Sequence, residues 1–284
     1  NSNLLYSEIK VVEGIPPGQN WDFQIFKVPN SVNKNDEILL AGTQSGIYEI
    51  VSNTAKQVYN GNLHAFYIHQ SSKNPNRIFS TDGFTDFISL IYKNGSWISE
   101  GKWQGLHDDI RSILEDHDGN LWLGTLTNGV IYVTIDPENV TKPKLIRYYK
   151  ERDGLNAISG CKLFNFEGQI IIGTEKGLMA YNPIIDKIEP FCKFGNQFCD
   201  GTNGVKNFVE SSSGLIFLSS INNRTGSISL LTKNENGAYN IFSSAFKRLP
   251  DMSSILSLYL DDDGIAWIGS NEGLFRYDPK EDNK

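Results

Sequence analysis

The sequence predicts an all-β fold, a β-propeller of six four-stranded blades that is closed by the N-terminal strand. Three observations predict it: a strand–turn–strand pattern recurs six times, its spacing matches one blade, and no segment has the caps and periodicity of a helix. A Gly-Thr pair, or a degraded form of it, marks each repeat at positions 42, 80, 124, 173, 219 and 269. The intervals of 38, 44, 49, 46 and 50 residues each fit one propeller blade and exceed a leucine-rich repeat.

Each repeat is predicted to form four strands, and the third copy shows the pattern most clearly. Residues 110–115 alternate between apolar and polar types, and the Asp118–Gly119 pair that follows is a strong hairpin signal. Residues 121–123 are a continuous apolar run, as expected for a strand covered on both faces, and Gly124 places no side chain where adjacent blades crowd together. The more polar segment 145–149 is predicted to be the fourth strand.

The sixth repeat lacks a fourth strand, because only residues 280–284 follow Asp278 and Pro279. The N-terminal run 4–12 has the composition of a spare strand, and its pairing with the last blade would remove the open sheet edges. The whole chain, residues 1–284, is therefore predicted to be a single β-propeller domain.

Composition excludes several classes of protein. The 26 basic and 33 acidic residues give a net charge of −7, which argues against nucleic acid as a partner because phosphate binding requires a basic surface. No apolar run approaches the roughly 20 residues of a membrane helix. The chain begins at Asn1 without a Met or a recognisable signal peptide, so we expect an excised piece or a mature form.

The three cysteines form an odd set. Cys192 and Cys199 bracket a short segment whose closure by a disulfide would indicate an oxidising compartment. Three separate reduced thiols are the other interpretation. Cys161 lies in an apolar, strand-like run and is interpreted as a small core residue.

The repeat itself carries a family resemblance. The string Asp-x-x-Gly-x-Leu-Trp-Ile-Gly-Thr-x-x-Gly-Leu-x-x-Tyr-Asp-Pro resembles the repeat of two-component regulator propellers, the extracytoplasmic sensing portions of bacterial hybrid two-component systems and sensor histidine kinases. The copies around Trp122 and Trp267 match best, those around Gly42 and Gly173 match fairly, and those around Ser80 and Ser219 match weakly.

The resemblance implies a periplasmic module of an inner-membrane receptor that binds a small molecule or an oligosaccharide. The implied partners are neighbouring domains of the same receptor and, in the full receptor, a second copy in a homodimer, with no role for nucleic acid. Any kinase activity would belong to segments absent from this chain, which is expected to be a fragment of a larger sensor protein. A complete six-bladed ring and a larger ring with one unrecognised blade both remain open.

Candidate ligand-binding residues are sought in the loops that differ between repeats, because loops on a rigid scaffold carry function. Aromatic rings beside Asp, Asn and Arg suit sugar hydroxyls, since the rings stack and the polar groups form hydrogen bonds, although such a composition is also ordinary for loops. The predicted ligand-binding residues, all placed on one face, are Trp21, Asp22, His64, Asp82, His107, Asp108, Arg111, Asn203, Asn223 and Arg224.

Two other functions are weighed against sensing. Streptogramin lyase-like propellers resemble this repeat family and use His with a divalent metal, and His64 and His107 could form a pair on one face. No carboxylate–His cluster with ligand spacing accompanies them, so no catalytic residue, metal or cofactor is predicted. A protein-interaction propeller is the third alternative, and it would display a contiguous apolar surface patch.

Overall fold

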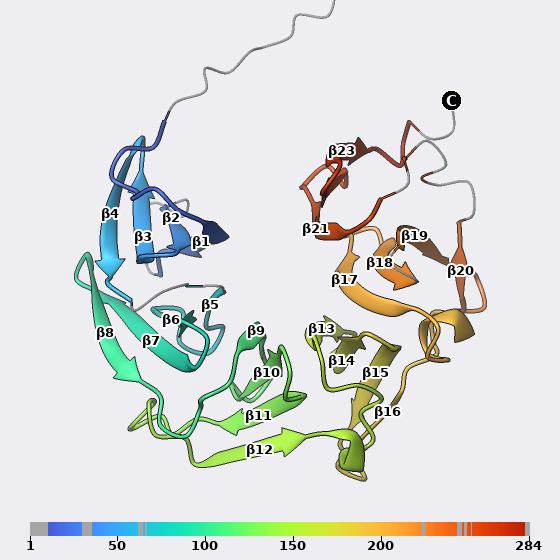
Figure 1. The fold of residues 1–284 in the computed structure, drawn as a ribbon, viewed down its shortest axis with the longest axis horizontal. Coiled ribbons are helices and arrows are strands. Elements are labelled where there is room, and N and C mark those ends of the chain that lie inside the picture. Colours follow the sequence, from blue (N-terminus) through green and yellow to red (C-terminus); the bar gives the residue numbers. More distant parts are fainter. Residues whose placement is uncertain are drawn as a thin grey trace, which may run out of the picture. The chain divides into compact units, whose positions relative to one another are not determined.

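The fold is an all-β propeller with six blades, as the sequence predicts (Figure 1). The computed structural model describes residues 11–29, 36–61, 65, 67–222, 225–242, 246, 249–250 and 252–281. Within these residues the only helical segments are two 3-10 turns, η1 (Glu151–Asp153) and η2 (Asn196–Phe198). None of the described segments is a helix long and apolar enough to cross a membrane.

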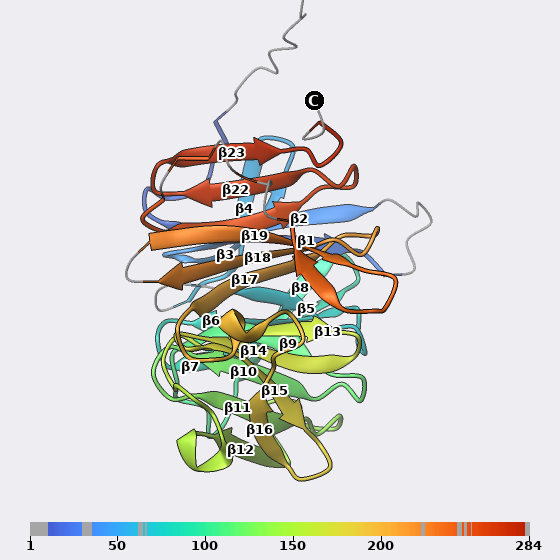
Figure 2. The same cartoon turned by 90° about the vertical axis from the view of Figure 1, so that its right-hand side faces the viewer.

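Each blade is a sheet in which strands that follow one another along the chain are neighbours. Blades 1 to 3 comprise β1 (Asn20–Lys27), β2 (Glu37–Thr43), β3 (Gly46–Val51) and β4 (Thr54–Tyr59), then β5 (Ile68–Gln70), β6 (Arg77–Asp82), β7 (Asp86–Lys93) and β8 (Ser96–Lys102), then β9 (Ile110–Glu115), β10 (Leu121–Thr125), β11 (Val130–Thr134) and β12 (Leu145–Tyr149). Blades 4 to 6 comprise β13 (Lys162–Phe166), β14 (Gln169–Thr174), β15 (Gly177–Asn182) and β16 (Lys187–Pro190), then β17 (Gly204–Glu210), β18 (Ile216–Asn222), β19 (Thr225–Lys233) and β20 (Tyr239–Ile241), then β21 (Ile255–Leu260), β22 (Ala266–Ser270) and β23 (Gly273–Tyr277). The antiparallel neighbours β17, β18 and β19 are seen side by side in Figure 2.

The chain forms two compact units. One comprises Asn1–Leu121 and Val133–Ile146, and the other comprises Trp122–Tyr132 and Arg147–Lys284, so that the boundary passes through blade 3. In the first unit, blades 1 and 2 pack face to face: Phe26, Leu40 and Ile47 are buried in one cluster with Ile78 and Ile88. Successive side chains of a strand point to opposite faces of the sheet, and this alternation places Phe26 of β1 and Leu40 of β2 on the face that packs against blade 2.

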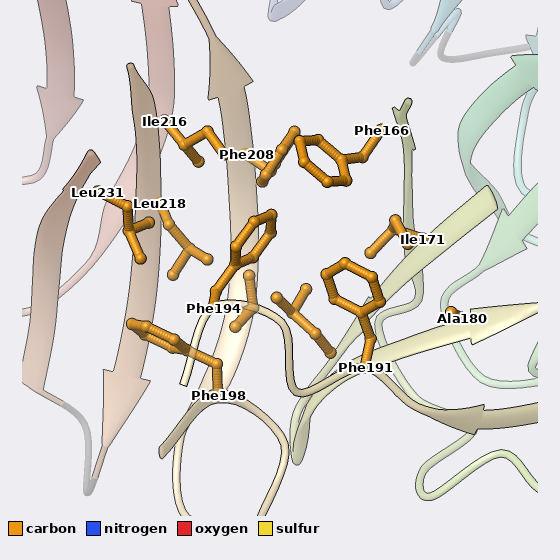
Figure 3. Close-up of a cluster of buried hydrophobic side chains, with 12 residues drawn as sticks. Phe166, Ile171, Ala180, Phe191, Phe194, Phe198, Phe208, Ile216, Leu218 and Leu231 are labelled. Carbon is orange, nitrogen blue, oxygen red and sulfur yellow. The ribbon is translucent and has the colours of Figure 1, made fainter. Parts of the chain in front are cut away.

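In the second unit, blades 4 and 5 share a core that is rich in phenylalanine (Figure 3). The loop between β16 and β17 contributes Phe194 and Phe198, which are 1% and 2% exposed, to a cluster with Phe166 and Phe208. The Phe194 and Phe208 rings stack with their centroids 5.6 Å apart. Such pairs add to the stabilisation that comes from area burial alone.

The Thr of the Gly-Thr repeat has a structural role in the turn that follows it. The Thr125 hydroxyl donates to the Gly129 carbonyl at 2.8 Å and accepts from the Asn128 N–H at 2.8 Å. Thr174 makes the same pair of bonds, to the Gly177 carbonyl at 3.0 Å and from the Lys176 N–H at 3.1 Å. The hydroxyl thus provides a partner for an N–H group of the turn and adds a second hydrogen bond to the carbonyl of the glycine that ends it; the Gly129 carbonyl also accepts from the Thr125 N–H.

The first Asp of the Asp-x-x-Gly string stabilises the hairpin turn that this string forms. One carboxylate oxygen of Asp116 accepts from the N–H groups of Asp118 and Asn120, both at 2.9 Å. Asp261 accepts from two turn N–H groups in the same way, and its other oxygen accepts from the Trp267 indole at 2.9 Å. These carboxylates act as turn caps, which agrees with the structural role that the sequence assigned to this part of the repeat.

The repeat glycine lies where neighbouring backbones approach closely. A Cβ on Gly42 would lie 2.4 Å from the Ala65 carbonyl oxygen, and one on Gly173 would lie 2.5 Å from the Val205 carbonyl oxygen. Both contacts join a second strand to the chain that enters the next blade of the same unit. The predicted role of this glycine, to leave room between blades, is confirmed at these two positions.

The predicted closing strand, residues 4–12, lies outside the described residues except for its last two positions. The chain that follows it runs along blade 1: Glu13 forms a parallel bridge with Thr54, and Val12 and Ile15 pack against Tyr48. Blade 6 has three strands within the described part of the chain. Closure by the N-terminal strand therefore stays a prediction.

Candidate functional site

The candidate site is built in the first unit, where the innermost strands of blades 1, 2 and 3 begin. Asp22 lies near the start of β1, and its carboxylate accepts a hydrogen bond from the Ile68 N–H, the first residue of β5, at 2.7 Å. This bond joins blade 1 to blade 2 and fixes the orientation of the carboxylate. Tyr67 immediately precedes Ile68, so the same bond holds the tyrosine beside Asp22.

Arg111 comes from the start of β9 and is held by Asp109. The carboxylate receives two hydrogen bonds from the guanidinium, from Nε at 2.5 Å and from Nη2 at 2.9 Å. The guanidinium carbon lies 5.9 Å from the centroid of the Phe84 ring, which is within the range of a cation–π contact. A bidentate pair of this kind gives Arg111 a defined orientation.

Three charged groups act on the pKa of the Tyr67 hydroxyl. Burial, and then the Asp22 carboxylate, raise the pKa of Tyr67 to about 12, Asp109 adds to the rise, and Arg111 acts in the opposite direction. The phenol is therefore neutral at physiological pH. Asp22, Asp109 and Arg111 thus all lie within electrostatic reach of the Tyr67 hydroxyl.

The Phe84 ring accompanies this polar cluster through its contact with Arg111. Phe84 is 50% exposed, so part of its ring surface is accessible to solvent, and Trp21, the sequence neighbour of Asp22, is 40% exposed. A planar group can stack on such a ring, while carboxylate, phenol and guanidinium groups nearby form hydrogen bonds. The arrangement is suited to recognition of a polar ligand with a flat apolar side.

Asp82 is buried and forms contacts within the protein, although the sequence analysis predicts that it binds ligand. Its side chain is buried; it accepts from the Tyr59 hydroxyl at 3.0 Å and lies 3.4 Å from Lys102 Nζ. Burial raises the pKa of Tyr59 well above its ordinary value, and the Asp82 charge adds to the rise. Asp82 thus joins the outer strand of blade 1 to blade 2 and faces away from solvent.

The other predicted residues divide into three groups. His107 is exposed and Asp108 is partly buried, both in the loop that leads to β9. Asn203 lies in the second unit, where its amide donates to the Gln197 carbonyl at 2.9 Å and supports the loop that contains η2. The predicted residues that lie outside the described part of the chain are His64, Asn223 and Arg224.

Three members of the cluster, Tyr67, Phe84 and Asp109, are not among the predicted ligand-binding residues. Tyr67 directly precedes a first strand, as Asp109 does in blade 3, so alignment of the repeats contained a signal for both. Phe84 lies in the β6–β7 turn, and only its contact with Arg111 identifies it. Within the described residues, no group of three or more His, Cys, Asp or Glu side chains could hold a metal ion.

Cys192 and Cys199 are joined by a disulfide, with their α-carbons 5.3 Å apart. The bond closes the loop that carries Phe194 and Phe198 into the core of blades 4 and 5. Cys161 is free and buried, and burial raises the pKa of its thiol to about 12. The predicted disulfide and the predicted core cysteine both agree with the structure.

Comparison with solved structures shows the fold. The extracellular domain of BT4673 from B. thetaiotaomicron, assigned as a hybrid two-component system, aligns over 95% of this chain with 18% identity and a TM-score of 0.67. An extracellular domain from the same bacterium, assigned as a one-component system, aligns over 94% with 13% identity and a TM-score of 0.56. The WD40 propeller domain of Doa1 aligns over 86% of this chain and 75% of its own, with 14% identity and a TM-score of 0.57.

The chain spans about a third of the first of these proteins and 39% of the second. No relative was found among the curated proteins. The family model for the two component regulator propeller matches residues 104–127 and 248–272, which contain the two strongest copies of the repeat, those of Trp122 and Trp267. The chain is therefore an all-β propeller that carries two-component regulator propeller repeats.

Proposed function

We propose that this propeller is the periplasmic ligand-sensing module of a two-component receptor, with an oligosaccharide as its ligand and no chemistry of its own. The observation that carries the proposal is the cluster of Asp22, Tyr67, Asp109 and Arg111 at the start of three innermost strands, together with Phe84 from the β6–β7 turn. We define these five residues as the blade 1–3 cluster. Its oriented polar groups beside the exposed Phe84 ring form a recognition surface without a nucleophile–base pair.

Three observations support the wider setting. The two regulator repeats and the likeness to an extracellular domain of a hybrid two-component system support a sensory role. The disulfide between Cys192 and Cys199 supports an oxidising compartment outside the cytoplasm. The whole chain would then be one propeller domain of a larger sensor protein, with neighbouring domains or a second receptor copy as its partners.

Signalling by such a module requires that the ligand binds one arrangement of the receptor more tightly than another. The Asp22–Ile68 hydrogen bond is a direct link between ligand contact and blade position, since the same carboxylate would touch the ligand and the neighbouring blade. A ligand that withdrew this carboxylate from Ile68 would weaken the contact between blades 1 and 2.

The test is calorimetric titration of the propeller with a panel of oligosaccharides. Arg111→Gln and Phe84→Ala are expected to weaken the binding of whichever oligosaccharide binds by roughly tenfold each, because each removes one polar or stacking contact. Arg152→Gln is the matched control, since Arg152 is an 81% exposed arginine side chain in the second unit. Binding that is unchanged by both cluster variants would overturn the site, and turnover of any titrated sugar would overturn a purely sensory role.

A further inference from the structure

The β6–β7 turn of blade 2 carries Phe84 of the blade 1–3 cluster, and two carboxylates face each other at its base. Asp82 ends β6 and Asp86 begins β7, and the two residues are direct partners in the ladder. Side chains at such paired positions are close neighbours on one face of the sheet, so two like charges there repel each other. A cation that contacts both carboxylates removes this repulsion.

Lys102, the last residue of β8, supplies that cation. Its Nζ lies 2.6 Å from Asp86 Oδ2 and 3.4 Å from Asp82 Oδ2, so one ammonium group bridges the two ends of the turn. The hydrogen bond with Asp86 raises the pKa of Lys102, and the ammonium group therefore stays charged at neutral pH. The Asp82 side chain is only 2% exposed, which makes its attraction to Lys102 stronger than that of a fully solvated pair.

The backbone that carries this lysine is fixed by the core of blade 2. Lys102 pairs with Ile88 in the ladder of β7 and β8, and the next residue, Trp103, is 2% exposed. The Trp103 ring lies edge-on to the rings of Phe79 and Phe87, with centroid distances of 5.6 and 5.2 Å. The ammonium group thus reaches the turn from a rigid base.

Blade 2 differs in this turn from blades 1, 3, 4 and 6. In those four blades the second strand ends at a Thr or Ser, whose hydroxyl donates to the carbonyl of the glycine that ends the turn. In blade 2 the second strand ends at Asp82, and charged groups bridge the turn. This bridged turn is the one that places the Phe84 ring centroid 5.9 Å from the guanidinium carbon of Arg111.

We propose that Lys102 is a positioning residue of the blade 1–3 cluster, which closes the β6–β7 turn through Asp82 and Asp86 and so holds the Phe84 ring against Arg111. A ring that is ordered before the ligand arrives loses less entropy on binding, which is the benefit of a preorganised site. The position of the ring is a property of the ligand-free protein and does not depend on the proposed function, whereas its effect on oligosaccharide affinity rests on that function.

The experiment records the fluorine NMR spectrum of the ligand-free 284-residue chain with 4-fluorophenylalanine at position 84. We expect Lys102→Met to shift the signal towards its position in the urea-unfolded chain, because the carboxylates of Asp82 and Asp86 then repel each other and the turn opens. Lys102→Arg keeps a cation at this position and should restore the wild-type signal. Asp86→Asn in the Lys102→Met background should reverse most of the shift, since it removes one of the two opposed charges.

Lys144→Met is the matched control, because Lys144 also pairs with an aspartate of the first unit, Asp136 at 3.6 Å, in blade 3. Its signal at position 84 should equal that of wild type, and a shift as large as that of Lys102→Met would overturn the proposal. Lys102→Gln also lacks the charge and takes the place of Lys102→Met if that variant does not fold. A wild-type signal in the uncharged variant would overturn the proposal, and so would a shift that neither Lys102→Arg nor Asp86→Asn reverses.

Calorimetry separates this inference from the proposed function. For an oligosaccharide that binds the wild-type chain, Lys102→Met should weaken the affinity by about two- to tenfold, since the Phe84 ring must then be ordered on binding. A shifted signal at position 84 with unchanged affinity would support the positioning role of Lys102 and would contradict the role of the blade 1–3 cluster in ligand binding.

Discussion

The Glu115 carboxylate, at the end of β9 in blade 3, accepts a hydrogen bond from the Ser71 hydroxyl of blade 2 at 2.8 Å. The hydroxyl and N–H of Ser72 donate to the same carboxylate, and the His69 imidazole lies 3.9 Å away. The Glu115 side chain is only 2% exposed. One buried carboxylate therefore fastens the β5–β6 turn of blade 2 to blade 3 within the first unit.

This fastening predicts a pH dependence of stability. Burial favours the neutral acid, but the His69 imidazole and the hydrogen bonds from Ser71 and Ser72 outweigh it and lower the pKa of Glu115 to about 2, below the ordinary 4.5. A depressed pKa contributes stability above pH 4.5 that is lost as the pH falls towards 2. We expect urea denaturation of Glu115→Gln to show a loss of about 2 kcal/mol at pH 7 and a flatter decline in acid than wild type.

Asp118→Asn is the control for this prediction, because the Asp118 side chain is 82% exposed. Its unfolding free energy should lie within about 0.5 kcal/mol of wild type at pH 7. A Glu115→Gln variant that declined in acid as steeply as wild type would show that another group sets the acid sensitivity.

The close approach at the repeat glycine predicts a sharp effect of one methyl group. Gly173→Ala would push a Cβ to 2.5 Å from the Val205 carbonyl oxygen, and backbone at that position cannot move aside easily. We expect a loss of roughly 1–3 kcal/mol, measured by chemical denaturation. Gly226→Ala is the matched control on β19, since its nearest neighbours lie at 3.4 Å, and equal losses in the two variants would contradict the crowding argument.

The hydrogen bonds of the Thr174 hydroxyl predict that serine, but not valine, can replace this threonine without a large loss of stability. Thr174→Val removes the bonds to the Gly177 carbonyl and from the Lys176 N–H, as well as the bond to Asn156, and should destabilise the fold by about 1–3 kcal/mol. Thr174→Ser keeps the hydroxyl and should recover most of that loss in the same thermal unfolding assay. A serine variant as unstable as the valine variant would mean that the methyl group, rather than the hydroxyl, matters.

The disulfide predicts a moderate loss of stability on its removal. The Cys192→Ser and Cys199→Ser double variant should unfold about 2 kcal/mol more easily, because its loop can then withdraw Phe194 and Phe198 from the core. Addition of a reductant to wild type should give the same loss, measured by urea denaturation. Cys161→Ala is the control, because this variant keeps the disulfide. Reductant should lower its unfolding free energy by as much as it lowers that of wild type.

The repeating elements could be predicted because each one carries its own local signal. The Asp118–Gly119 turn, the apolar run after it and the spacing of the Gly-Thr pairs all act within one hairpin, so the six blades follow from the sequence. The parts of the sequence that lack this signal were harder to place. The predicted N-terminal strand would need a partner far along the chain, and no local pattern specifies such a pairing, so closure by this strand stays a prediction.

The candidate site was predicted only in part, because it depends on contacts between blades. Asp22 and Arg111 were identified from their loop positions, and the structure brings both to Tyr67. Asp82 occupies a comparable position in the sequence, but it folds inward to the Tyr59 hydroxyl. The sequence of a single repeat cannot indicate the Asp82–Tyr59 contact or the Phe84–Arg111 contact, because each contact joins residues at least 23 positions apart.

The hydroxyl-fastened turns separate the architecture of a blade from the identity of its surface residues. In each of these turns the Thr or Ser hydroxyl donates a hydrogen bond to the backbone carbonyl of the glycine that ends the turn. The intervening residues are Gln-Ser, Leu-Thr-Asn, Glu-Lys and Asn-Glu in four copies of the same turn, so very different side chains are tolerated there. New recognition properties can therefore arise at these tips by substitution of two or three residues, while the blade beneath folds as before.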